Sequence, residues 1–342
     1  MSHAKKKIGW IATSLIALSL MLAACGGGNS NNAAGSPSAS AGASPSAEQT
    51  ASPSASAAAS TDASAERTLT DGLGNEVTVP ANPERIIASY LEDHLVALGV
   101  KPVAQWSVAN GIQDYLQGEL EGIPTIAFDL PYEAVASFTP DLIIVGSSGL
   151  VEGDKYGQYS KIAPTFVLGD EINNDWRQAL LKIGEVLGKS DEAQKALDDY
   201  DAKAKDAKEK LQQAVASESA AVLWLTNKQF YVVSESQSSG AVLYGDLGLT
   251  VPEVVKEISA AGSASWNSIS LEKLAELDAD HIFLINSDVA SGSEALQDPI
   301  WQSIPAVKNG NVYEFDSKES WLYSGAIANG QMIDNVLASL VN

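Results

Sequence analysis

The only cysteine of the chain, Cys25, follows Leu22-Ala23-Ala24 at the end of a short N-terminal apolar stretch. Three lysines at positions 5–7 precede this stretch and polar residues interrupt it, which is typical of a signal peptide rather than a membrane span. A thiol after small residues is the nucleophile that forms a thioether with a diacylglycerol. We therefore predict a signal peptide at 1–24, lipidation of Cys25 and anchorage at the outer face of the cytoplasmic membrane, as in Gram-positive bacteria.

A second set of chemically capable residues lies in polar loops that follow predicted strands. Tryptophan and tyrosine in such loops offer a flat apolar face and a hydrogen-bonding group, which suits the binding of a small organic molecule. The alternative is that each aromatic side chain packs in the hydrophobic core of the domain that contains it. We expect this of Trp224 and Trp301. The candidate ligand-binding residues are Trp106, Tyr132, Ser147, Gln237, Trp266, Trp321 and Tyr323.

Charge and histidine content exclude several classes of function. The formal net charge is −22, which argues against nucleic acid and against a polyanionic ligand. The chain has three histidines and neither a Gly-x-Ser-x-Gly elbow nor a phosphate-binding glycine loop, so we expect no enzyme and no cofactor. Glu92-Asp93-His94 could form a zinc or manganese site, but adjacent residues of a helix do not share a face. We expect no metal site and a monomer.

The candidate loops need a scaffold, and the hydropathy pattern predicts one. Apolar strands at 85–88, 103–106, 125–128, 141–145 and 164–168 alternate with helices, and the alternation resumes after residue 220. This pattern predicts an α/β fold with mostly parallel sheets, in which ligands bind beyond the carboxyl ends of strands. Between the two halves, one long charged helix is either a strut between lobes or packed on the surface of one lobe.

Composition divides the chain into five parts. Residues 26–66 are built largely from Ser, Ala, Gly and Pro, which bury too little apolar surface to offset chain entropy. We predict a disordered tether at 25–66 that carries the lipidated cysteine. An N-terminal lobe at 67–189, a connecting helix at 190–215 and a C-terminal lobe at 216–342 complete the predicted organisation.

Several short stretches occur in an ordered set across residues 67–342. They include Leu98-Gly99-Val100-Lys101-Pro102-Val103, Pro140-Asp141-Leu142-Ile143-Ile144, and Leu271-Glu272-Lys273-Leu274 before Asp280-His281-Ile282-Phe283-Leu284, with further matches at 83–87, 161–165 and 306–310. Together they resemble the iron-siderophore and vitamin B12 class of ABC substrate-binding proteins. The resemblance implies two Rossmann-like lobes joined by a rigid helix, with a ligand cleft between them, as in class III periplasmic binding proteins.

The resemblance also implies a ligand class. An iron(III)-siderophore fills the coordination sphere of its own metal, so the protein would bind an organic shell. Arginine is scarce past the linker, which favours a neutral or cationic ferric hydroxamate over an anionic catecholate. Relatives that bind hydroxamates often have an arginine where this chain has Gln237-Ser238-Ser239. Cobalamin, haem or another chelate is the alternative ligand. A ligand-free structural wall lipoprotein and a lipoprotein that binds a bare metal ion are more remote alternatives.

The partner implied by the resemblance is an ABC permease in the membrane. Members of the family dock on it through one acidic residue on each lobe. Asp93 or Glu92 matches the position in the first lobe, and Glu272 matches the position in the second. An exposed ion pair contributes about 0–1 kcal/mol, so these residues would orient the complex more than they would tighten it.

Overall fold

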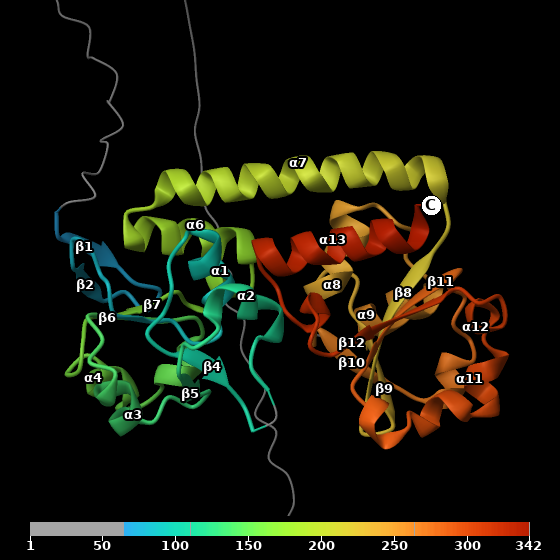
Figure 1. The fold of residues 1–342 in the computed structure, drawn as a ribbon, viewed down its shortest axis with the longest axis horizontal. Coiled ribbons are helices and arrows are strands. Elements are labelled where there is room, and N and C mark those ends of the chain that lie inside the picture. The colour runs from blue at the N-terminus through green and yellow to red at the C-terminus, as the bar shows by residue number, and fades with distance from the viewer. Residues whose placement is uncertain (1–64, 110, 263, 342) are drawn as a thin grey trace, which may run out of the picture. The chain divides into compact units, whose positions relative to one another are not determined.

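The computed structural model describes residues 65–109, 111–262 and 264–341 (Figure 1). The predicted signal peptide, Cys25 and nearly all of the predicted linker lie outside the described residues. Within the described ranges, no helix is both long enough and apolar enough to cross a membrane.

The first lobe begins with a β-hairpin and continues into parallel strands. In the hairpin, Asp71 accepts hydrogen bonds from the amides of Leu73 (2.9 Å) and Asn75 (2.8 Å), which fixes the turn. All four residues of β6 are buried, as expected for a strand that is covered on both faces. The pairs are β1 (Arg67–Thr70) antiparallel to β2 (Glu76–Val79), β3 (Ile86–Ile87) and β7 (Thr165–Val167) parallel to β6 (Leu142–Val145), and β4 (Gln105–Ser107) parallel to β5 (Thr125–Ala127).

Short helices connect these strands. The longest, α6, begins at the side chain of Asp175, which accepts from the amides of Arg177 and Gln178, and it ends at Gly188 with φ of 68°. The helices of the first lobe are α1 (Glu92–Ala97), η1 (Asp114–Leu116), α2 (Gln117–Leu120), α3 (Tyr132–Ser137), η2 (Ser148–Val151), α4 (Lys155–Tyr159), α5 (Asp170–Asn173) and α6 (Trp176–Leu187).

The second lobe contains a five-stranded sheet in the order β10-β9-β8-β11-β12. Strands β8 (Ala220–Thr226), β11 (His281–Asn286) and β12 (Val312–Asp316) are parallel, whereas β9 (Gln229–Val233) runs antiparallel to both β8 and β10 (Trp266–Ile269). Trp266, predicted to lie in a polar loop, is instead the first residue of β10, which forms an edge of the sheet. The helices are α8 (Ser238–Gly240), the π-helix η3 (Ala241–Asp246), α9 (Glu253–Ala261), α10 (Leu271–Leu274), η4 (Val289–Ser291), η5 (Glu294–Gln297), α11 (Pro299–Ser303), α12 (Pro305–Lys308), η6 (Ser320–Leu322) and α13 (Ala326–Leu340).

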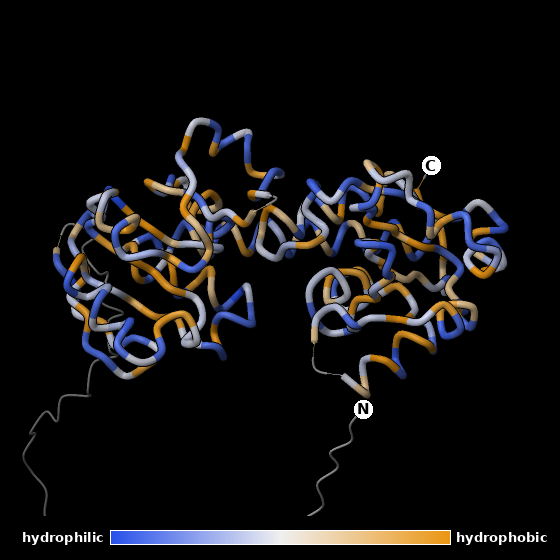
Figure 2. The backbone as a smooth tube through the Cα atoms, turned by 90° about the horizontal axis from the view of Figure 1, so that it is seen from below, coloured by the Kyte–Doolittle hydropathy of each residue, from blue (hydrophilic) through white to orange (hydrophobic). Residues whose placement is uncertain are grey.

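The predicted long helix is α7 (Ser190–Ala214), and it packs on both lobes. Figure 1 shows α7 running along α6 and α13, and it also contacts η3. Beneath it, one apolar cluster joins the lobes and includes Leu180 of α6, Leu211 of α7 and Val336 of α13. Two further clusters each belong to one lobe, and Figure 2 shows hydrophobic stretches of the backbone in both lobes. The helix is therefore part of a shared core and not a bare strut.

Candidate functional site

Three exposed apolar side chains follow the carboxyl ends of strands in the first lobe. Tyr90 follows β3, Val108 follows β4 and Phe128 follows β5, and their exposed fractions are 49%, 41% and 54%. The amide of Phe128 bonds to the carbonyl of Ser107 (3.0 Å), so the chain leaves β4 and β5 side by side. Apolar side chains exposed at strand ends are typical of ligand-binding surfaces, so these three residues form a candidate for one.

An aromatic group extends from this edge to the second lobe. The Tyr90 ring lies 4.9 Å from Trp106 and 6.1 Å from Tyr323, and Tyr115 lies 5.0 Å from Tyr323, all between ring centroids. The hydroxyl of Tyr323 also donates to the carbonyl of Ile112 (3.1 Å). We call Tyr90, Trp106, Tyr115 and Tyr323 the seam cluster, because it contains side chains from both lobes.

The backbone of Tyr90 is strained, with φ of 66°. Such a conformation costs about 1–3 kcal/mol in a residue other than glycine and persists where the surroundings impose it. Next to it, Glu92 is buried and its Oε1 accepts the amide of Trp106 (2.6 Å), which ties α1 to β4. This bond holds the backbone of Trp106 against α1, which begins two residues after Tyr90.

Asp93 links α1 to the N-terminus of α13. Its Oδ1 accepts the amide of Ile327 (3.1 Å), and its Oδ2 accepts the amide of Ala328 (2.8 Å). The same Oδ2 accepts the hydroxyl of Tyr115 (3.0 Å), so Asp93 also holds a member of the seam cluster.

Burial changes the acid–base properties of three consecutive residues in α1. It raises the pKa of Glu92 to about 7, although the Trp106 amide opposes the change. Burial likewise raises the pKa of Asp93 to about 6, against the bonds from α13 and Tyr115, and it lowers the pKa of His94 to about 4. Neither Glu92 Oε2 nor His94 Nδ1 has a hydrogen-bond partner. Among the described residues, no group of His, Cys, Asp and Glu is arranged to hold a metal ion.

The prediction that Asp93 or Glu92 docks on a permease is wrong. The exposed fractions of the two residues are 2% and 0%, so neither can form the surface ion pair that docking requires. Glu272, by contrast, is exposed at the second position of α10. Its counterpart in the first lobe is the exposed Glu133, at the second position of α3. Each glutamate precedes the first residue of a buried strand, β11 or β6, by nine positions, and this repeat was visible in the sequence.

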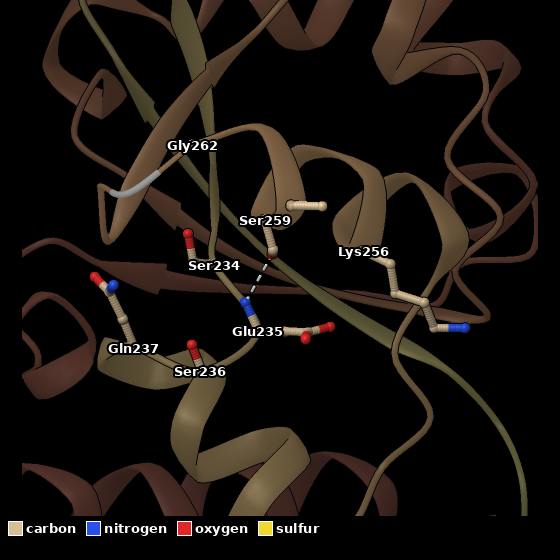
Figure 3. A pocket seen from close by; sticks show the side chains of 8 residues that line it. Ser234, Glu235, Ser236, Gln237, Lys256, Ser259 and Gly262 are labelled. Carbon is tan, nitrogen blue, oxygen red and sulfur yellow. Dashed lines mark hydrogen bonds between the residues drawn. The ribbon is translucent and has the colours of Figure 1, made fainter. Parts of the chain in front are cut away.

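A surface pocket of about 360 Å³ opens on the second lobe. Its lining includes Glu235, Gln237, Lys256 and Ser259 (Figure 3). The Ser259 hydroxyl of α9 accepts the amide of Glu235 (3.0 Å). Gln237, a predicted ligand-binding residue, accepts the hydroxyl of Ser265 (2.8 Å) through its Oε1. Gln237 immediately precedes α8, and α8 contacts η6, the short helix before Tyr323.

Strand direction places the loops of the second lobe at two opposite ends of its sheet. Because β9 runs antiparallel to β8, its carboxyl end and Gln237 lie at the opposite edge of the sheet from the carboxyl ends of β8 and β11. At that far edge, Lys228 pairs with Glu294 (2.7 Å). Lys256 lines the pocket, although it was not among the predicted site residues, and its ammonium group pairs with Glu253 (3.1 Å).

The remaining candidate residues take different positions. Trp321 has no exposed surface; its ring stacks on Phe283 (5.2 Å between centroids) and lies tilted against Phe315 (4.9 Å). The prediction that Trp321 faces a ligand is therefore wrong, because its side chain belongs to the core. Trp301 is buried, as predicted. Tyr132 is half-buried against Tyr159 (5.0 Å).

Two candidates keep partly exposed positions. Trp266 is in an edge strand rather than a loop, packed edge-on against the half-buried Trp224 (5.9 Å). The Ser147 hydroxyl donates a hydrogen bond to Asp170 (2.8 Å) and accepts one from the amide of Gly149, so it already has two partners within the protein.

Comparisons with known proteins identify the family and the fold of the chain. A family model described as periplasmic binding protein matches residues 90–319. The iron(3+)-hydroxamate-binding protein FhuD of Bacillus subtilis is 29% identical over 325 residues, or 92% of each chain, and an iron-uptake system-binding protein of the same organism is 31% identical over 70% of this chain and 75% of its own. A solved FhuD-fold binding protein, described as a component of a Fep/Fec-like ferrichrome ABC transporter from Bacillus subtilis, has a TM-score of 0.68 at 26% identity, covering 80% of this chain and 100% of its own. This similarity confirms the predicted two-lobed α/β architecture.

Proposed function

Because the chain belongs to the periplasmic binding protein family, we propose that it captures an iron(III)-siderophore, preferably a ferric hydroxamate, and delivers it to an ABC importer. It acts as a binding protein and not as an enzyme, tethered outside the cell by the lipidated Cys25. The names of two relatives support this assignment, since one binds iron(3+)-hydroxamate and the other serves iron uptake.

The observation that carries the proposal is the seam cluster beside the exposed side chains of Val108 and Phe128. Aromatic rings and methylene-binding surfaces suit the organic shell of a chelate whose metal is already coordinated. Lys256, which lines the pocket of the second lobe, is paired with Glu253 (3.1 Å). Arg177 is engaged by Asp246 (2.8 Å) and lies over the Trp176 ring, and Lys228 lies at the far edge of the sheet. This balance supports a neutral or cationic chelate over a polyanionic one.

Tryptophan fluorescence provides the test, because Trp106 lies in the seam cluster. We expect ferrioxamine B or ferrichrome to quench the emission at sub-micromolar concentration, whereas a ferric catecholate and cobalamin should act weakly. Trp106→Phe should lose a large part of the quench. Trp301→Phe is the matched control, because that ring is buried against Phe230 in the core of the second lobe. Quenching by the catecholate alone would refute the hydroxamate preference, and no response to any chelate would refute siderophore capture.

Docking on the permease is proposed to use Glu133 and Glu272. Both are exposed and occupy equivalent positions in the two lobes. Hydrogen bonding within the first turn of α10 and from Ser270 lowers the pKa of Glu272, which keeps it ionised in mildly acidic surroundings.

A further inference from the structure

The N-terminus of α13 is capped by a side chain from the other lobe. Its own N-cap residue is Gly325, which has no side chain to bond the first amides of the helix. Asp93 of α1 accepts the amides of Ile327 and Ala328 instead, which are the second and third of the helix. A β-carbon added at Gly325 would lie 2.2 Å from Asp93 Oδ1, so the absence of a side chain leaves room for the carboxylate.

The environment of Asp93 makes this contact specific. Apart from burial, the groups that act on its pKa are the amides of Ala326, Ile327 and Ala328 and the hydroxyl of Tyr115, with no lysine or arginine among them. A carboxylate buried without a cation depends on hydrogen bonds and on the positive end of the 15-residue helix. The capping bonds of Asp93 are therefore matched to one relative position of α1 and α13.

Asp93 connects this cap to the proposed ligand site. Its bond to Tyr115 fixes a ring that packs on Tyr323, which lies three residues before α13. We propose that Asp93 is a positioning residue for ligand capture, which sets the placement of α13 against α1 and thereby aligns the seam cluster across the two lobes. The effect of Asp93 on ligand binding rests on the proposed function, whereas its effect on the placement of α13 against α1 does not.

The test compares Asp93→Asn with Asp175→Asn. Asp175 also caps the second and third amides of a helix, α6, but touches no member of the seam cluster. Both variants should be less stable in urea. Only Asp93→Asn should weaken ferrioxamine B binding by the folded protein, by about tenfold, because hydrogen bonds to a charged group are worth roughly this factor. Equal affinity in folded Asp93→Asn and wild type would overturn the proposal.

Two further measurements cover the other outcomes. Tyr115→Phe removes only the hydroxyl that Asp93 holds, so it should weaken binding even if Asp93→Asn does not fold, and wild-type affinity in that case would refute the inference. Spin labels at the exposed positions 161 and 308, in a full chain with Cys25→Ser, report the distance between the lobes without any ligand. Asp93→Asn should broaden this distance distribution and Asp175→Asn should not. An unchanged distribution would refute the positioning role, whereas a broadened one with no siderophore binding by wild type would refute only the proposed function.

Discussion

Glu92 should make the stability of the protein depend on pH near neutrality. Burial raises its pKa from 4.5 to about 7, so the folded state favours the protonated form. The resulting stabilisation is fully present below pH 4.5 and is lost as the pH rises through about 7. Each unit of pKa difference corresponds to about 1.4 kcal/mol, so this contribution should fall by roughly 2–3 kcal/mol between pH 5 and pH 8.

The perturbation that isolates this effect is Glu92→Gln, which keeps an acceptor for the Trp106 amide but cannot ionise. Urea unfolding of both proteins at pH 5, 6, 7 and 8 gives the difference in their free energies of unfolding. That difference should shift by roughly 2–3 kcal/mol in favour of the variant as the pH rises. His94 favours the folded state when it is neutral, so its contribution to the free energy of unfolding falls at acidic pH, opposite to that of Glu92. Because His94 is present in both proteins, this contribution cancels in the difference between them.

The matched control is Glu121→Gln, at an exposed position of the same lobe. The difference for Glu92→Gln should change more with pH than the difference for Glu121→Gln, which removes a charge at the surface. A pH-independent difference for Glu92→Gln would refute the reasoning, because it would mean that Glu92 is solvated in the folded protein.

Two other predictions follow from burial and exposure. Trp321→Ala should cost about 3–5 kcal/mol of unfolding free energy in urea, because it empties a fully buried site against Phe283, and a loss below 1 kcal/mol would place the ring in solvent instead. The double variant Glu133→Gln, Glu272→Gln should bind ferrioxamine B like wild type but stimulate the permease ATPase in proteoliposomes less than either single variant does. The control Glu121→Gln should stimulate the ATPase like wild type. Wild-type stimulation by the double variant would exclude these glutamates from docking.

Most of the strands and long helices could be predicted from the sequence, because their signals are local. The hairpin at Asp71, the buried run of β6 and the stop of α6 at Gly188 each depend on residues within a few positions. Strand β10 was missed because Trp266 and its neighbours gain strand structure only by pairing with β9. The direction of β9, which moves Gln237 to the other edge of its sheet, is also a property of pairing.

Site residues were harder to predict, since their roles depend on contacts between distant segments. Trp321 follows polar residues like a loop aromatic, yet it packs on Phe283 and Phe315 of two strands. The buried state of Asp93 arises from α13, more than 230 positions away in the chain. Trp106 remains a prediction as a ligand contact, and its place in the seam cluster supports it.

The apolar cluster beneath α7 ties the folding of one lobe to that of the other. A chain cut between α7 and β8 would leave Leu180 and Leu211 on one fragment and Val336 on the other, each with apolar surface facing water. Neither fragment should fold alone, and mixing them should restore a native fold by complementation. For the same reason, relatives cannot exchange single lobes as modules unless the facing surfaces of α6, α7 and α13 are inherited together.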